Sequence, residues 1–157
     1  MTNMDTIRDF FTEREWKYEL SDDGTLLFAS FGIPCRLKSV RIVFDADPQN
    51  KYMRILGISP MDVDEENRAA VCEYLTAANY GGSIGGFEMD PRDGEVRYRI
   101  GIMDRDGTGV SKETIEHGLD IVVAMFANYG DGLVSVMMGF SDPATEIEKV
   151  RKRYRKH

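Results

Sequence analysis

Hydrophobic residues along the chain switch repeatedly between a helical and a strand spacing. Near the N-terminus, four of them recur three or four positions apart: Met4, Ile7, Phe10 and Phe11. This spacing predicts a short amphipathic helix over residues 4–15. Thr2 or Asn3 would provide its N-cap, because both side chains can accept a hydrogen bond from the first turn.

Strand patterns follow this helix. Trp16 and Tyr18 alternate with polar residues and indicate a short strand. Three longer segments, each bounded by turn-forming residues, then show strand character: 25–33, 36–45 and 51–59. Because the connections between them are short, we expect neighbouring strands to pair antiparallel.

The segment over residues 62–79 returns to a helical period. Its hydrophobic stripe consists of Val63, Ala70, Val71, Tyr74, Leu75 and Ala78. Asp62 and Glu65 stand three residues apart and resemble a capping box at the start of this helix. Asn79 and the Gly81-Gly82 pair mark its end.

Two further strands are predicted after this second helix. Residues 83–90 and 95–103 flank Pro91-Arg92-Asp93-Gly94, a sequence typical of a hairpin turn. The second of these strands alternates cleanly, with four apolar residues at every other position: Val96, Tyr98, Ile100 and Ile102. It therefore presents one buried and one solvated face.

A long helix is predicted from Ser111 onwards. Its hydrophobic stripe consists of Ile115, Leu119, Val122, Phe126, Tyr129, Leu133, Val136 and Phe140. The stripe keeps its phase through Gly130 and Gly132, which favours a continuous or kinked helix, although a break there is the alternative. Pro143 ends the pattern, and residues 144–155 read as a separate terminal helix.

The predicted order of elements is α-β-β-β-β-α-β-β-α(-α). Mostly antiparallel strands with helices segregated to one face define a two-layer α+β fold. A length of 157 residues suits one domain of this kind. We therefore expect an α+β domain over residues 1–142 and a basic helical tail over residues 143–157.

The charge of the chain is unevenly distributed. The formal net charge is −7, yet six of the last nine residues are Lys or Arg: Lys149, Arg151, Lys152, Arg153, Arg155 and Lys156. The acidic body argues against a general nucleic-acid binder. A polar N-terminus and the absence of an 18-residue apolar run predict a cytoplasmic protein with no membrane association.

Candidate catalytic and metal-binding groups are few. Of the two histidines, His117 lies off the helical stripe and His157 is the last residue, so a histidine-based triad or metal site lacks partners. Cys35 and Cys72 stand far apart in sequence and read as small buried thiols. We therefore expect no enzymatic activity and no cofactor.

The acidic loop at residues 104–109, DRDGTG, is the one segment that invites a metal ion. In an EF-hand register, Ile102 would occupy the first ligand position, where it cannot coordinate calcium. A glycine-rich turn between strand and helix is the favoured interpretation. A small metal-dependent enzyme that uses this loop remains an alternative hypothesis.

The basic tail allows three interpretations. It can be a solvated helix end that complements the helix dipole, which is the favoured one. It can dock on an acidic surface, including that of this protein itself. It can also contact nucleic acid with weak, salt-sensitive affinity, which makes a nucleic-acid-associated regulator the other alternative.

One stretch, CEYLTAANYGGSIGGFEMDPRDGEVRYRIGI, carries a family resemblance. It is similar to the YbjN domain family of bacterial sensory transduction regulators, over about residues 5–140. The residues that carry the resemblance are structural: Asn79, Gly86, Phe87, Asp90, Asp93 and Gly94. None of these residues is catalytic, so the resemblance implies no active site.

The resemblance implies a fold similar to that of class I type III secretion chaperones, and a protein that often forms homodimers. Such chaperones hold an extended stretch of a partner protein by strand addition or apolar patches. We therefore expect a non-catalytic, chaperone-like or regulatory module that binds another protein. The sequence does not identify that partner, its pathway or the dimer interface.

Overall fold

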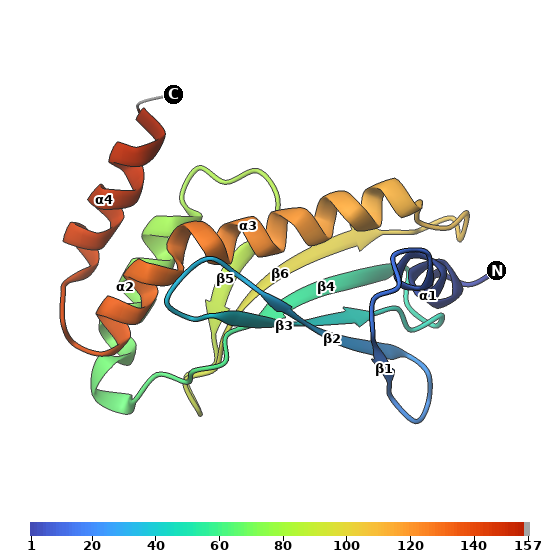
Figure 1. Cartoon of the computed structure of the whole chain (residues 1–157), viewed down its shortest axis with the longest axis horizontal. Coiled ribbons are helices and arrows are strands. Elements are labelled where there is room, and N and C mark those ends of the chain that lie inside the picture. Colours follow the sequence, from blue (N-terminus) through green and yellow to red (C-terminus); the bar gives the residue numbers. More distant parts are fainter. Residues whose placement is uncertain (156–157) are drawn as a thin grey trace.

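The computed structural model describes residues 1–155 and contains one antiparallel sheet with helices packed on it (Figure 1). The helices are α1 (Asn3–Glu13), α2 (Arg68–Asn79), α3 (Lys112–Met137) and α4 (Pro143–Arg155), with a 3₁₀ turn, η1 (Glu65–Asn67), directly before α2. The strands are β1 (Glu19–Leu20), β2 (Leu26–Gly32), β3 (Ser39–Asp45), β4 (Tyr52–Ile58), β5 (Gly86–Met89) and β6 (Val96–Met103). The α+β class predicted from the hydrophobic pattern is confirmed.

The sheet has the strand order β1-β2-β3-β4-β6-β5, and every neighbouring pair is antiparallel. Short loops connect β1 to β4 in sequence, so these strands lie side by side as a meander. Residues 59–85 then leave the sheet through α2, and the chain returns in β5, on the far side of β6. As a result β1 and β5 form the two outer edges of the sheet.

The two faces of the sheet differ in character. One face carries fully buried side chains and packs on the helices; examples from three strands are Leu27, Ile42, Phe44 and Ile55. Helix α3 runs along this face (Figure 1) and approaches so closely that a Cβ at Gly57 would lie 2.4 Å from a Val122 methyl carbon. The opposite face carries Val43 and Leu56, which lie outside the main core cluster.

Helix α3 is continuous through Gly130 and Gly132, as the uninterrupted stripe predicted. Gly132 allows contact with α2, since a Cβ there would lie 2.4 Å from the Tyr74 hydroxyl oxygen. The helix is long and apolar enough to cross a membrane by length and composition, but half of its apolar stretch is buried within the fold. A core helix passes the same test.

Three predictions about helix ends and cysteines are wrong. Helix α3 ends at Met137 because Gly139 turns the chain at φ +73°, and Phe140 is 72% exposed instead of lying on the stripe. Asp62 and Glu65 form no capping box: a 3₁₀ turn without a side-chain cap precedes α2. Cys72 is exposed and Cys35 half-buried, and both are free thiols.

The strand predicted at Trp16 and Tyr18 lies later in the chain, at Glu19–Leu20. Trp16 instead packs edge-on against the rings of Phe10, Phe11 and Phe31, at centroid distances of 5.1–5.9 Å. These contacts hold the segment before β1 against α1. The segment therefore cannot continue the pairing along β2.

Candidate functional site

The outer edge of β5 is closed by a side chain. The Asn79 amide oxygen accepts a hydrogen bond from the Phe87 N–H at 2.7 Å, and its amide nitrogen donates to the Phe87 carbonyl at 2.8 Å. Asn79 thus occupies the two backbone groups that a further strand would use. The edge at β5 is protected against strand addition at this residue.

Other residues of the family motif surround this contact. Gly86 lies directly against Asn79, since a Cβ there would come 3.4 Å from the amide group. Phe87 is buried and packs edge-on against Tyr98, Phe126 and Tyr129. The motif therefore joins the end of α2, the edge strand and the long helix α3.

The hairpin turn after β5 holds the rest of the motif. Gly94 has φ +81°, and its carbonyl accepts a hydrogen bond from the Val63 N–H at 2.9 Å. Asp93 accepts a hydrogen bond from the Glu95 N–H at 3.0 Å. Hydrogen bonds from Arg92 lower the pKa of Asp90 to about 2. These contacts stabilise the turn and leave its carboxylates on the surface, where they accept hydrogen bonds.

The backbone of β2 points alternately toward β3 and toward the outer edge. The Ile33 N–H donates to the Lys38 carbonyl, and the Ala46 N–H donates to the Thr25 carbonyl. Both bonds belong to the β2–β3 register, so the odd-numbered residues of β2 bond to β3. The even-numbered residues direct their N–H and C=O groups away from β3.

The outer edge of β2 is only partly covered. Strand β1 pairs with Leu27 and Phe28, and this pairing does not extend toward Ser30. Ser30 and Gly32 lie beyond this pairing, are exposed, and face the side on which no strand within residues 1–155 pairs with them. Their backbone groups form a free strand edge.

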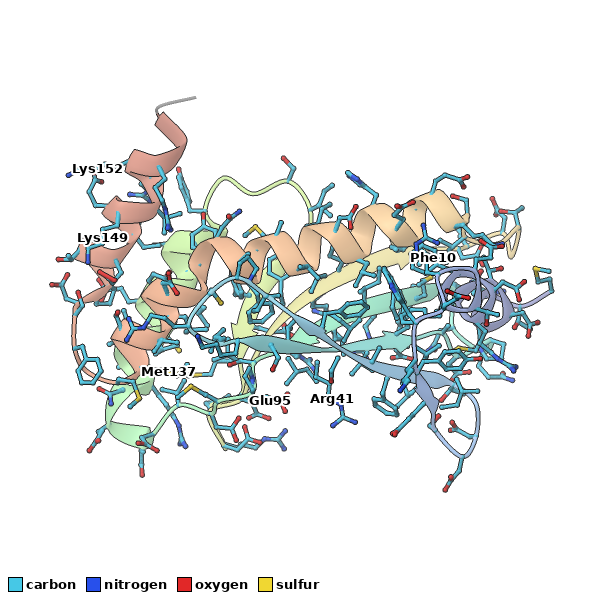
Figure 2. The ribbon with its side chains drawn as sticks, viewed as in Figure 1. Phe10, Arg41, Glu95, Met137, Lys149 and Lys152 are labelled. Atoms are coloured by element: carbon cyan, nitrogen blue, oxygen red, sulfur yellow. The ribbon has the colours of Figure 1, made fainter. Side chains whose placement is uncertain are left out.

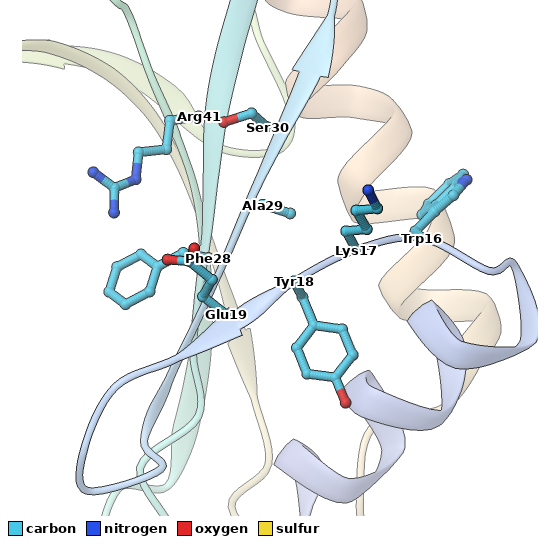
Figure 3. A pocket seen from close by; sticks show the side chains of 8 residues that line it. All are labelled: Trp16, Lys17, Tyr18, Glu19, Phe28, Ala29, Ser30 and Arg41. Carbon is cyan, nitrogen blue, oxygen red and sulfur yellow. The ribbon is translucent and has the colours of Figure 1, made fainter.

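A cavity of about 750 Å³ lies beside this free edge (Figure 3). Its walls are the chain from Trp16 to Glu19, the β2 residues from Phe28 to Ser30, and Arg41 of β3. Figure 3 shows the segment before β1 diverging from β2, with the open wedge between them. The aromatic contacts of Trp16 hold that segment apart from β2, and the cavity lies between the two.

One side of this site is aromatic. Trp16 is 39% exposed and its ring lies 5.1 Å from that of Phe31, a half-buried β2 residue. Phe11 supports both rings from α1, at 5.7 Å and 6.3 Å. An apolar side chain placed beside Phe31 would contact a preformed aromatic surface.

The other side of the site carries the cation Arg41 and, where β1 begins, the carboxylate of Glu19. The guanidinium of Arg41 lies 4.7 Å from the centre of the Phe28 ring, and Figure 3 shows both side chains on the same side of β2. Neither Arg41 nor Lys17 forms an ion pair with any carboxylate in the described part of the chain. Both cations are therefore available to a ligand.

The acidic loop over residues 104–109 serves the fold. The Asp104 carboxylate accepts hydrogen bonds from the Asn3 side chain at 2.8 Å and from the Gly109 N–H at 3.1 Å. Asn3 also accepts a hydrogen bond from the Val110 N–H, so the loop ties α1 to the start of α3. Within residues 1–155, no group of three His, Cys, Asp or Glu side chains is placed to hold a metal ion.

The basic tail lies in α4, at one end of the molecule, whereas Arg41 lies near the middle of its long axis (Figure 2). Lys149 pairs with Glu146 at 2.8 Å, and Arg153 donates to the Asn128 carbonyl at 2.9 Å. Arg151 and Lys152 are exposed. The Arg155 side chain and Lys156 lie outside the described residues, and the tail's role in partner binding stays a prediction.

The site at β2 was not predicted from the sequence. Its residues form no sequence motif, and each is of a type that is common in strands or turns. The one available signal was the low polarity of residues 25–33 on both faces, which is unusual for a strand near a sheet edge. The free edge becomes visible only once the order of the strands is known.

Comparisons with known proteins agree with the resemblance noted in the sequence. The model of the YbjN family, described as "Putative bacterial sensory transduction regulator", matches residues 3–134. The crystal structure of YbjN, "a putative transcription regulator from E. coli", has a TM-score of 0.57 at 11% identity, covering 79% of this chain and 85% of that one. This likeness shows a shared fold.

A second solved structure, that of the HopA1–SchA chaperone–effector complex, has a TM-score of 0.46 at 14% identity. The match covers 87% of this chain and 90% of that one. No curated protein matches the chain. Helix α4 lies beyond the stretch that the family model matches.

Proposed function

The chain belongs to the YbjN family of bacterial sensory transduction regulators, and from this premise we propose that it is a non-catalytic module that binds an extended segment of another protein. The segment adds as a strand to the free edge of β2. We place this activity in the cytoplasm.

The observation that supports this proposal is a difference between the two sheet edges: the backbone groups are hydrogen-bonded at one edge and unpaired at the other. At β5, Asn79 already holds the N–H and C=O of Phe87. At β2, Ser30 and Gly32 leave the same kinds of group unpaired with any strand of residues 1–155, and Ser30 lines an open cavity. Strand addition gains affinity from such backbone hydrogen bonds and specificity from pockets for alternate side chains.

The geometry suits a short segment. Ser30 and Gly32 provide two donors and two acceptors on one side of β2, enough for a strand of about four or five residues. Its residues would alternate between the aromatic side of the site, at Trp16 and Phe31, and the cationic side, at Arg41. Such a segment would be recognised by both its backbone and its side chains.

The test uses a displayed library of seven-residue peptides, from which binders are selected and synthesised. We expect a bound peptide to protect the Ser30 and Gly32 amide protons from hydrogen exchange, measured by NMR. Protection at Phe87 is expected to stay unchanged because Asn79 already bonds that N–H. A bound peptide that leaves Ser30 unprotected would contradict the proposal.

A pair of variants at Ser30 sharpens this test. Ser30→Pro removes the outward N–H, whereas Ser30→Ala keeps it and removes only the hydroxyl. We expect the proline variant to weaken peptide binding by about tenfold or more, because one backbone hydrogen bond is lost and the ring obstructs the edge. The alanine variant should bind as the unaltered protein does, and circular dichroism checks that both fold.

A further inference from the structure

We infer that the segment bound at the free edge of β2 carries an acidic side chain between two apolar ones, and that its carboxylate pairs with Arg41. This inference rests on the proposed strand addition and specifies its partner. It follows from the position of one arginine that has no carboxylate partner within the part of the chain that the structure describes.

Arg41 differs in its ion pairing from the other arginines on the face of the sheet that carries Val43 and Leu56. On that face, Arg54 pairs with Asp45 at 2.6 Å, and Arg97 and Arg99 both pair with Glu88. Arg41 is exposed, and its guanidinium contacts the Phe28 ring without a carboxylate partner among residues 1–155. The face thus has one strong hydrogen-bonding cation that its own carboxylates do not satisfy.

The contact with the Phe28 ring orients the Arg41 guanidinium before any ligand binds. An exposed arginine usually loses rotamer freedom when it forms an ion pair, which offsets part of the gain. Here the cation–π contact at 4.7 Å already orients the guanidinium beside the cavity. Less ordering is therefore required when a carboxylate arrives.

The register of the sheet places the acidic position. Ser30 and Arg41 are direct cross-strand partners, so their side chains share one row and one face. A residue opposite Ser30 on an added strand would continue the same row. Only the small Ser30 side chain would separate it from Arg41, a span that a glutamate can cross (Figure 3).

The residues on either side of this position would point to the opposite face, since side chains alternate along a strand. There they would meet the exposed ring of Trp16 and the half-buried ring of Phe31. Apolar side chains suit both places. Lys17 also lines the cavity, and its side chain lies beside Trp16, on the other side of β2 from Arg41 (Figure 3).

The experiment measures binding of fluorescein-labelled peptides by fluorescence anisotropy. The peptides share the sequence Ser-Thr-Val-X-Val-Thr-Ser, with Glu, Gln or Lys at X. We expect the Glu peptide to bind about three- to fivefold more tightly than the Gln peptide, as for a partly exposed ion pair, and the Lys peptide to bind weakest. Raising the salt concentration should reduce the difference.

Charge variants assign the preference to Arg41. Arg41→Gln should remove the difference between the Glu and Gln peptides, and Arg41→Glu should make the Lys peptide the best ligand. Lys51→Gln is the matched control: it makes the same charge change at an exposed residue outside the cavity. This control should keep the preference for Glu.

The outcomes separate the two proposals. Equal binding of all three peptides, with loss on Ser30→Pro, would overturn the acidic preference and leave strand addition standing. A preference for Glu that survives Arg41→Gln would overturn the role of Arg41. If no peptide binds, or if Ser30→Pro has no effect, strand addition itself is overturned and this inference with it.

Discussion

At the scale of single residues, the protein distinguishes its two sheet edges with one amide. Asn79 extends from the end of α2 and copies the hydrogen-bonding pattern of a strand. An amide is required because it supplies one donor and one acceptor at the correct spacing. No such group stands beside Ser30 within the described residues, and that edge remains available.

Replacing Asn79 tests this arrangement. Asn79→Asp keeps the shape but replaces the donor with a second acceptor facing the Phe87 carbonyl. We expect it to reduce the free energy of unfolding by about 1–3 kcal/mol, because a part-buried carbonyl loses its partner. Urea denaturation measures the change. Asn50→Asp, which alters charge equally in a loop, should change stability by less than about 0.5 kcal/mol.

Asp90 gives the motif a pH dependence. Its pKa is lowered from 3.8 to about 2 by hydrogen bonds from the Arg92 side chain and N–H. A lowered folded-state pKa means that this contribution is complete above about pH 4 and is lost as the pH falls toward 2. Asp90→Asn should therefore flatten the stability profile between these values, and an unchanged acid limb in denaturant titrations would contradict this.

At the scale of elements, α4 is integrated into the fold although it lies beyond the family match. Ile147 and Val150 are buried against α2 and α3, whereas Lys149, Arg151 and Lys152 are exposed. The sequence showed a basic terminal helix but not that its apolar residues complete the core. Most residues of this segment are charged, and two apolar residues are too few to define a hydrophobic stripe in its sequence.

Removing one of these apolar contacts should therefore destabilise the whole domain. We expect Ile147→Ala to reduce the free energy of unfolding by about 2–4 kcal/mol, as for other buried aliphatic side chains. Lys152→Ala on the exposed face of α4 should have little effect. If thermal and urea denaturation show the two variants to be equally stable, α4 is not part of the core.

At the scale of the whole molecule, no helix of residues 1–155 covers one face of the sheet. Val43 and Leu56 lie on that face beside Phe28 and a row of arginines. The homodimer expected from the family resemblance stays a prediction. Nothing in a single chain identifies the surface that a second copy would use.

Light scattering coupled to size-exclusion chromatography tests the dimer. We expect a mass near twice 17.8 kDa at micromolar concentrations. A mass of one chain across that range would show that the module works as a monomer. Strand addition at β2 does not depend on this result, because all residues of the site come from one chain.

The sequence by itself determined the elements and the class of fold. Hydrophobic period reports directly which face of a helix or strand is buried, and the Asp93-Gly94 turn fixes a hairpin locally. Tertiary structure alone decided which edge is closed, because Asn79 meets Phe87 only after α2 packs beside β5. It also decided where β1 begins, through the ring contacts of Trp16, and that Arg41 has no carboxylate partner among residues 1–155. These properties depend on residues far apart in sequence. A local sequence pattern cannot show whether a charged side chain has a partner in the folded chain.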